Sequence, residues 1–263
     1  GLPGKSVLVA GCGTGRWACH FAASFPKASV LAVDVSHASL AFAAEQKQRF
    51  GLENVVFEHA DLRSWSTERG FDFIECGGVL HHLEDPMAAW ARLVSTLKSD
   101  GAMLVALYSR LARWPFKEMR RDVLQSIQPS ISGSHGSALL DKSVVLDDET
   151  LRAFRKELLA RTWKPELMPL ASGLDFHSLS RLRDCFFHPL EHEYTLLEVE
   201  DMLQRLGLQF MGFEGVARAS LLRKHLGARA DPLDLRAWHA LEERMPGLFL
   251  GMYRMFVRKI KCE

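Results

Sequence analysis

The chain has 263 residues, of which 48% are hydrophobic and 25% are charged. This composition supports a sizeable apolar core in one large or two small domains, and it excludes an intrinsically disordered chain. The 33 Lys and Arg residues nearly balance the 32 Asp and Glu residues, so the net charge of +1 provides no overall attraction to nucleic acid or to a membrane. No apolar stretch approaches the length needed to cross a bilayer.

The cysteines and the start of the sequence bear on the cellular compartment. The five cysteines are scattered without paired spacing, which is typical of reduced thiols. No signal peptide is recognisable at the start of the sequence. These two features predict a cytoplasmic protein.

The first predicted element lies in residues 7–15, with the sequence VLVAGCGTG. An apolar run that leads into a glycine cluster indicates a buried strand, a tight turn and a helix that begins at Arg16. Glycines permit positive φ angles and a close approach of the backbone to a ligand, which the free N–H groups of the helix would also face. A dinucleotide fingerprint needs glycine in place of Arg16, so the spacing counts against a nicotinamide-dependent oxidoreductase, the alternative interpretation of this turn.

Three further apolar runs, at residues 30–33, 55–57 and 71–76, predict the next strands. Each run is followed by residues suited to a ligand, namely Asp34, Asp61 and the pair Gly77-Gly78. Strands that alternate with helices form a parallel, doubly wound sheet. Ligands of such sheets bind beyond the carboxyl ends of the strands, where these residues would lie.

After a helix that begins at Asp85-Pro86 and a fifth strand at residues 102–107, the alternation is interrupted. The next segment, up to about residue 190, is too long for a connection and is predicted to form a helical cap over the strand ends. A capping box that begins at Thr195 opens a further helix. The other predicted elements are helices at 111–128, 148–162 and 233–244 and strands at 208–213 and 252–257.

Four motifs, GCGTG, AVD, HAD and GGVLHHLEDP, together resemble the class I S-adenosylmethionine-dependent methyltransferases over residues 5–108. The resemblance implies an α/β fold with a Rossmann-like, doubly wound sheet of seven strands, the last of them antiparallel. It also implies S-adenosyl-L-methionine as the cofactor and S-adenosyl-L-homocysteine as the product. By the same resemblance, the cofactor-binding residues are Gly11, Cys12, Gly13, Gly15, Asp34, Val35, Asp61, Leu62, Gly77 and Gly78.

The later motifs LYSRLAR, DFHSLSRLRD, FFHPLEHEYT and LFLGMYRMFVRK are similar to those of bacterial methyltransferases fused to tetratricopeptide repeats. This resemblance implies a domain of a larger protein, with tetratricopeptide repeats in the same full-length chain. We therefore expect a cofactor-binding core at residues 1–109 and a helical cap at residues 110–190. Residues 191–263 would complete the core with two strands and an insertion at residues 215–251.

Methyl transfer requires an acceptor held close to the methyl group, and a base nearby where the acceptor carries a proton. His81 and His82 follow the fourth strand, and we favour His81 as the base; the alternative is that His81 packs under the loop. Tyr108 ends the fifth strand, where it would orient the acceptor or lie near the sulfonium, or else form part of the rim.

Residues 188–192, with the sequence HPLEH, have the spacing of His-x-x-Glu-His zinc sites. Pro189 prevents the two histidines from lying one helical turn apart, so no metal is expected. Glu191 and His192 are instead expected to line the inner wall of the cap and to contact the acceptor. The alternative is that they join the cap to the sheet by hydrogen bonds.

The sequence thus predicts methyl transfer to a small-molecule or peptide acceptor enclosed by the helical cap. One alternative is an RNA methyltransferase, in which basic residues at helical spacing bind phosphates, although a capped pocket suits a smaller partner. Those basic residues are Arg110, Arg113, Lys117 and Arg120. The other alternative is a non-catalytic module that binds the cofactor or serves as a scaffold. No membrane partner is expected.

Overall fold

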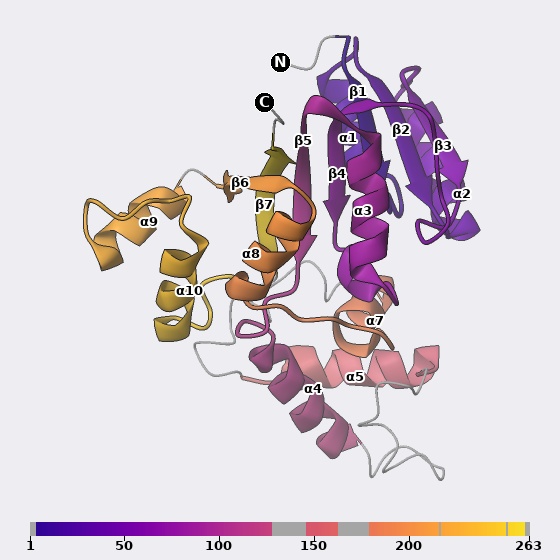
Figure 1. Ribbon diagram of the computed structural model, residues 1–263. Helices are drawn as coiled ribbons and strands as arrows, with labels where there is room; N and C mark the ends of the chain where they lie inside the picture. The colour runs from indigo at the N-terminus through magenta and orange to yellow at the C-terminus, as the bar shows by residue number, and fades with distance from the viewer. Residues whose placement is uncertain (1–3, 128–145, 163–178, 216, 251, 261–263) are drawn as a thin grey trace.

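The computed structural model describes residues 4–127, 146–162, 179–215, 217–250 and 252–260. Their centre is a seven-stranded sheet with the order β3-β2-β1-β4-β5-β7-β6 (Figure 1). Strands β1 to β5 pair in parallel, and β7 runs antiparallel to both β5 and β6, which confirms the predicted Rossmann-like fold. The strands are β1 (Ser6–Ala10), β2 (Ser29–Asp34), β3 (Val55–His59), β4 (Phe71–Gly77), β5 (Leu97–Leu107), β6 (Leu208–Phe213) and β7 (Tyr253–Lys259).

Helices cover both faces of the sheet, so that its central strands are buried. Helices α1 (Arg16–Ser24) and α2 (His37–Arg49) pack on one face, where their small alanines allow a close approach. Helices α3 (Pro86–Thr96) and α8 (Leu196–Arg205) pack on the other face through larger apolar residues. Alternate residues of β1 belong to the two cores, as the two-residue period of a strand requires.

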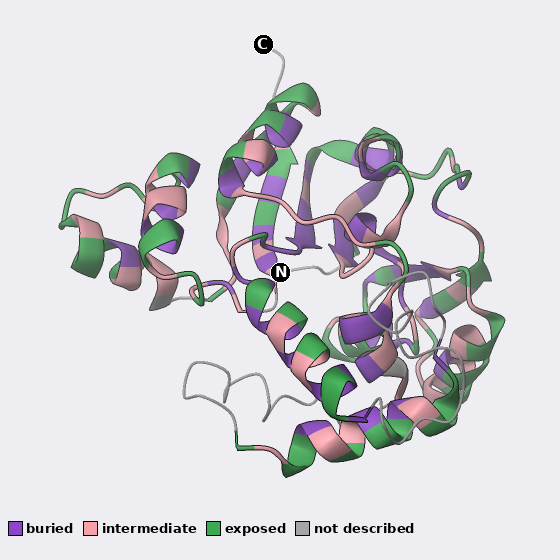
Figure 2. Cartoon of the chain, turned by 90° about the horizontal axis from the view of Figure 1, so that it is seen from below, coloured by how far each residue is buried: buried purple, intermediate pink, exposed green. Residues whose placement is uncertain are grey.

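A third layer of helices lies beyond the carboxyl ends of the parallel strands (Figure 1). Helices α4 (Trp114–Ile127), α5 (Asp148–Ala160) and α7 (Leu179–Phe187) pack around an apolar cluster of their own, with Phe154 fully buried inside it. Viewed from below, these helices turn buried residues inward and exposed residues outward (Figure 2). An amphipathic helix needs such a partner, and here the helices provide it for one another.

Strand β5 and helices α4, α9 and α10 differ most from the prediction, and α4 begins three residues after its predicted start. Strand β5 begins at Leu97, five residues before the predicted start, because the chain becomes extended directly after α3. Its pairing with β4 is irregular there, with a register shift between Phe71 and Phe73 of β4. Helix α9 (Ala217–Leu226) was not predicted, since its apolar residues form no clear stripe. The helix predicted at 233–244 is α10 (Leu235–Arg244), which begins after the N-cap. A single 3-10 turn, η1 (Leu80–His82), follows β4.

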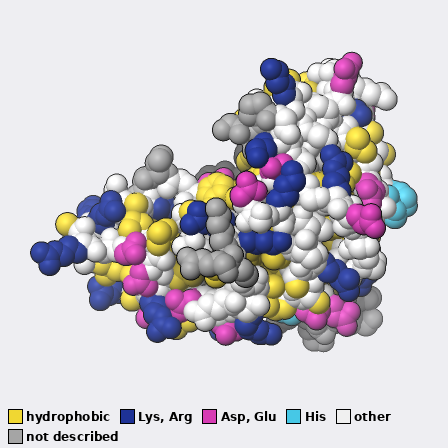
Figure 3. Space-filling model, turned by 45° about the horizontal axis from the view of Figure 1, so that its top comes forward, with side chains coloured by type: hydrophobic (Ala, Val, Ile, Leu, Met, Phe, Trp, Pro, Cys, Tyr) yellow, Lys and Arg dark blue, Asp and Glu magenta, His cyan; other side chains and the backbone are white. Residues whose placement is uncertain are grey.

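Neither the surface nor the helices indicate a membrane-spanning or strongly charged protein. Within the described ranges, every helix is too short or too polar to cross a bilayer. On the face shown in Figure 3, Lys and Arg side chains are interspersed with Asp and Glu side chains. This distribution agrees with the near balance of charge in the sequence.

A buried carboxylate joins the connection between β6 and β7 to the sheet. Glu242 of α10 is fully buried and accepts hydrogen bonds from Ser109 Oγ at 2.5 Å and from the Tyr253 hydroxyl at 2.6 Å. Burial raises the pKa of Glu242, and the two hydrogen bonds oppose the shift. Ser109 Oγ in turn accepts a hydrogen bond from the Ala112 N–H at 2.9 Å. The network therefore fixes α10 against the ends of β5 and β7.

Replacing Glu242 by Ala leaves two buried hydroxyl groups without an acceptor. We expect the free energy of unfolding to fall by roughly 2–4 kcal/mol in Glu242→Ala, measured by urea denaturation. The matched control is Glu243→Ala, because Glu243 is the next residue of α10 and has an exposed side chain. It should change stability by less than about 0.5 kcal/mol. Equal stability of the two variants would contradict the role given to the network.

Candidate active site

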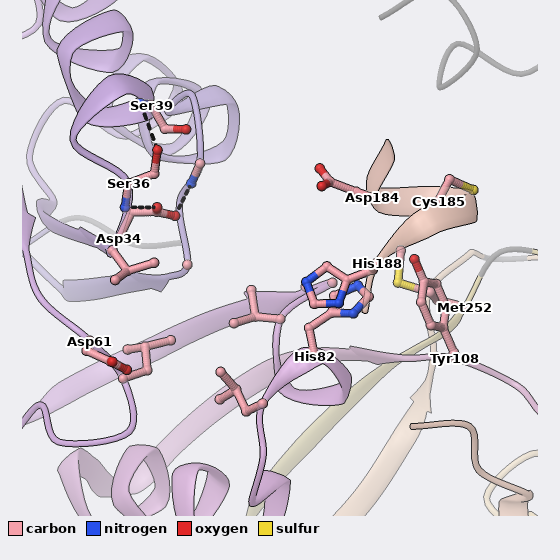
Figure 4. A pocket seen from close by; sticks show the side chains of 18 of the residues that line it. Asp34, Ser36, Ser39, Asp61, His82, Tyr108, Asp184, Cys185, His188 and Met252 are labelled. Carbon is pink, nitrogen blue, oxygen red and sulfur yellow. Dashed lines mark hydrogen bonds between the residues drawn. The ribbon is translucent and has the colours of Figure 1, made fainter. Parts of the chain in front are cut away.

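A cavity of about 730 Å³ lies between the carboxyl ends of the parallel strands and the helical layer (Figure 4). Its lining comes from segments that are far apart in the sequence. The lining residues are Gly11, Gly13, Asp34, Val35, Ser36, Ser39, Ala60, Asp61, Leu62, Gly77, Gly78, Val79, His82, Leu83, Tyr108, Arg113, Phe116, Asp184, Cys185, His188 and Met252. This is the place at which ligands of doubly wound sheets bind.

The glycine turn presents bare backbone to one end of the cavity. Gly11 has a φ of 73°, and a Cβ built on it would lie 2.3 Å from a methyl carbon of Val79. Gly15 has a different role, because a Cβ there would meet the side chain of Ala43 at 2.6 Å, and Gly15 does not line the cavity. The Cys12 side chain also lies outside the lining, in the core under α1, where burial raises the pKa of its thiol to about 12.

Asp34 fixes the glycine turn and also faces the cavity. Its Oδ2 accepts a hydrogen bond from the Gly13 N–H at 2.7 Å, and its Oδ1 accepts one from the Ser36 N–H at 2.8 Å (Figure 4). An ionised carboxylate accepts about four hydrogen bonds, so lone pairs are left for a ligand. A carboxylate that faces a cavity beside a bare glycine turn fits the ribose hydroxyls of the cofactor that the sequence implies.

Three other predicted cofactor residues form the wall next to Asp34. Asp61 lines the cavity, but its carboxylate also pairs with Arg63 at 2.6 Å, and the hydrogen bonds from Arg63 lower the pKa of Asp61. Leu62 is buried in the wall, whereas Val35 is largely exposed at the rim. An apolar wall with polar groups at its edge suits a purine base.

Gly77 and Gly78 form the middle of the cavity wall at the end of β4. A Cβ on Gly77 would lie 2.6 Å from Oε1 of Glu75, a carboxylate that is 2% exposed. That Oε1 has no hydrogen-bond partner among the described residues. Burial raises the pKa of Glu75 to about 7; Arg254 opposes the shift and Glu214 adds to it. The sequence prediction missed Glu75. The only local signal was that an acidic residue stands inside an apolar run.

His82 lines the cavity, and His81, the residue favoured from the sequence, does not. His81 is fully buried under the loop, as the alternative interpretation holds, because the tight turn η1 directs successive side chains to different sides. Its ring lies 3.8 Å from the ring of Tyr108, and burial holds the pKa of His81 well below its usual value. Tyr108 does line the cavity, and burial raises the pKa of its hydroxyl.

The tautomer of His82 follows from its hydrogen bond. Nδ1 of His82 lies 2.9 Å from the carbonyl oxygen of Leu190, which can only accept, so Nδ1 carries the proton and Nε2 keeps a lone pair. Burial lowers the pKa of His82 to about 4, and the bond to Leu190 opposes that shift. The ring of His188 lies 3.8 Å from the ring of His82. The cavity thus contains a neutral imidazole next to a second one.

Glu191 and His192 lie behind the cavity wall. Glu191 binds the guanidinium group of Arg113 at 2.7 and 3.0 Å, with both side chains almost fully buried. The ring Nε2 of His192 lies 3.0 Å from the carbonyl oxygen of Leu83. The backbone N–H of His192 donates to the carbonyl oxygen of His81 at 2.8 Å. Neither residue lines the cavity, and these bonds match the alternative interpretation, in which they tie segments together.

The His-x-x-Glu-His spacing does not bring its three side chains to one point. His188 Nδ1 lies 2.5 Å from the carbonyl oxygen of Leu190, while Glu191 and His192 bind Arg113 and Leu83. Within the described ranges, no group of three His, Cys, Asp or Glu side chains is arranged to hold a metal ion.

Several lining residues were not predicted to bind a ligand. Arg113 was interpreted as part of a basic helix face. Met252 and Cys185 carried no local signal at all. They line the cavity because the strand order and the helical layer bring residues 184–188 and 252 next to β4 and β5.

Residues 7–101 match the family described as methyltransferase domain. An uncharacterized protein of Synechococcus sp. is 30% identical over 209 residues, which cover 79% of this chain and 48% of that protein. The trans-aconitate 2-methyltransferase of Methylobacterium radiotolerans is 28% identical over 197 residues, which cover 72% of this chain and 73% of that enzyme.

Solved structures share the fold over the whole chain. PKMT2 from Rickettsia typhi in complex with AdoHcy has a TM-score of 0.66 at 16% identity, and the alignment covers 100% of this chain and 50% of that one. The [4+2]-cyclase SpnF has a TM-score of 0.50 at 17% identity, with 98% and 76% of the two chains covered. The chain therefore spans about half the length of PKMT2 and of the Synechococcus protein.

Glu75 should make stability depend on pH. Its pKa is about 7 in the folded chain against 4.5 as the ordinary value, so between these pH values the folded state holds a proton that the unfolded state lacks. Stability should therefore fall as pH rises through this window, by about 3 kcal/mol relative to Glu75→Gln. Urea denaturation of both proteins from pH 4.5 to 8 measures the difference. Glu53→Gln, at an exposed position, should follow the wild type; a difference between wild type and Glu75→Gln that is constant with pH would contradict the assignment.

Removing Glu191 should leave the buried Arg113 without its partner. We expect Glu191→Ala to lower the free energy of unfolding by roughly 3–5 kcal/mol, and the double variant Arg113→Met/Glu191→Leu to recover most of that loss. Glu118→Ala removes a carboxylate from an exposed pair with Arg121 and should cost less than about 1 kcal/mol. If Glu191→Ala is as stable as the wild type, the pair does not hold the wall, and Glu191 is available to an acceptor.

Proposed function

We propose that residues 7–101, which match the methyltransferase domain family, form a class I S-adenosylmethionine-dependent methyltransferase domain and that the chain methylates a small-molecule or peptide acceptor. One observation carries the proposal. A single cavity continues from the cofactor residues Asp34 and Gly78 to a group of side chains that includes His82 and Tyr108. Both reactants would thus meet in one cavity, and bringing them together is the main requirement of a transfer reaction.

Different residues along this cavity would bind the cofactor and the acceptor. The glycine turn and Asp34 would hold the sugar and amino-acid parts of S-adenosylmethionine, and Asp61 and Leu62 would flank its adenine. The cofactor supplies an activated methyl group on a sulfonium. Tyr108 and Phe116 offer aromatic surface at the opposite end, where an acceptor would lie.

His82 is the best placed base for an acceptor that carries a proton. Its Nε2 has a lone pair, and the Leu190 carbonyl fixes the orientation of the ring. His81 cannot take this role without rearrangement, because it is fully buried. A base held in one orientation at the acceptor typically contributes a factor of about 10²–10⁴ to the rate.

The helical layer supports a small acceptor. Phe116 of α4 and Asp184 of α7 both line the cavity, so α4 and α7 would act as the cap that encloses it. The basic side chains in and before α4 offer little free charge to RNA, since Arg110, Arg113 and Lys117 each pair with a glutamate. Fusion to tetratricopeptide repeats stays a prediction, which is compatible with a chain that spans half of its Synechococcus relative.

The decisive experiment is calorimetric titration of the chain with S-adenosylmethionine, S-adenosylhomocysteine and NAD. We expect micromolar binding of the first two compounds and none of the third. Asp34→Ala should weaken binding of S-adenosylhomocysteine by more than about tenfold, because it removes a charged hydrogen-bond acceptor from the ribose site and frees the Gly13 N–H.

The matched control is Asp100→Ala, since Asp100 is an exposed carboxylate that does not line the cavity. This variant should bind like the wild type. Binding of NAD, or an unchanged dissociation constant in Asp34→Ala, would refute the assigned cofactor site.

A further inference from the structure

The charges at the acceptor end of the cavity are unevenly compensated. Arg113 is the only Lys or Arg among the described residues of the lining, and its Nε and Nη2 donors are engaged, while Nη1 lies 3.9 Å from Cys185 Sγ. They bind both oxygens of Glu191 at 2.7 and 3.0 Å and the carbonyl oxygen of Cys185 at 2.7 Å. Its guanidinium plane lies 4.1 Å from the ring of Tyr108 and 4.3 Å from that of Phe116. The charge of Arg113 is therefore compensated by Glu191, and its side chain is almost fully buried.

Asp184 provides the opposite charge without such compensation. It lines the cavity from α7, and no described residue forms a salt bridge or hydrogen bond with its carboxylate. Arg183, the neighbouring cation, instead binds Asp148 at 2.8 Å. Figure 4 shows the Asp184 side chain directed away from α7, above the imidazoles of His82 and His188. Partial burial raises the pKa of Asp184, and the two nearest cationic or imidazole groups, His188 and Arg183, oppose that shift.

The two imidazoles add acceptors rather than positive charge. Nδ1 of His82 faces the carbonyl oxygen of Leu190, and burial lowers the pKa of the ring, so the neutral ring keeps a lone pair on Nε2. The acceptor end thus combines a free carboxylate, a lone pair on an imidazole and the aromatic surface of Tyr108. Carboxylates and aromatic faces bind ammonium groups, and an acceptor with a carboxylate would meet repulsion from Asp184 instead.

We propose that the methyl acceptor is an amine, whose ammonium group is bound by Asp184 in the cavity that His82 also lines. This inference rests on the proposed function and names its substrate class. The ammonium first loses one proton, which passes by way of His82 Nε2 to solvent. The amine nitrogen then forms a bond to the methyl carbon while the carbon–sulfur bond breaks, and that electron pair stays on the sulfur of S-adenosylhomocysteine.

The test compares three probes that differ only in the charge of one end: n-hexylamine, hexanol and hexanoate. The chain is first titrated with S-adenosylhomocysteine by calorimetry, and the loaded protein is then titrated with each probe at pH 7.5 by NMR. We expect the hexylammonium ion to bind roughly tenfold more tightly than hexanoate, since an amine is cationic at this pH. With S-adenosylmethionine, mass spectrometry should find N-methylhexylamine and no methyl hexanoate.

Variants of Asp184 make the test specific. Asp184→Asn should remove the preference for the cation, and Asp184→Lys should reverse it, with affinity for S-adenosylhomocysteine within about twofold of wild type in both. Glu149→Gln, at an exposed carboxylate of α5, should keep the preference. A blocked peptide with one lysine distinguishes the source of the amine, since tighter binding than hexylamine would assign the amine to a peptide.

The outcomes separate the two proposals. If S-adenosylhomocysteine does not bind, the proposed function fails and the amine inference fails with it. If it binds, but hexanoate is preferred or the preference for hexylammonium survives in Asp184→Asn, the amine inference alone is overturned.

Discussion

The buried ion pair of Arg113 and Glu191 is the interaction on which the cavity depends. The pair joins α4 to the segment after α7, and the same guanidinium binds the backbone of α7 at Cys185. It also lies between the rings of Tyr108 and Phe116. A buried guanidinium needs hydrogen-bond partners. The start of α4, the helix α7 and the segment after α7 must therefore be positioned together.

The two ends of the cavity are built by different means. The end beside Asp34 includes bare backbone, because a side chain at Gly11 or Gly77 would meet the side chain of Val79 or Glu75. The acceptor end is made of side chains that come from the helical layer and from the loop after β4. Backbone geometry thus limits which residues fit at the first end, whereas the second is shaped by side chains such as Asp184.

The sequence pattern predicted the strands and the residues at their carboxyl ends. Apolar runs and glycines gave the strands, and Asp34 and Gly78 lie in the cavity because the ends of parallel strands share one edge of a sheet. The choice between His81 and His82 depended on a single 3-10 turn, which no period in the sequence reveals. The raised pKa of Glu75 depends on tertiary context. Its burial and its charged neighbours Arg254 and Glu214 cannot be seen in the sequence of a single strand.

The place of β7 in the sheet has a consequence for biosynthesis. This strand lies between β5 and β6, although it is the last strand in the sequence, and its Tyr253 shares the Glu242 carboxylate with Ser109 at the end of β5. On the ribosome, the nucleotide half can pair its strands as soon as β4 emerges. The edge of β5 that pairs with β7 has to wait for translation of residues 253–259. The order of synthesis thus separates the maturation of the two halves in time.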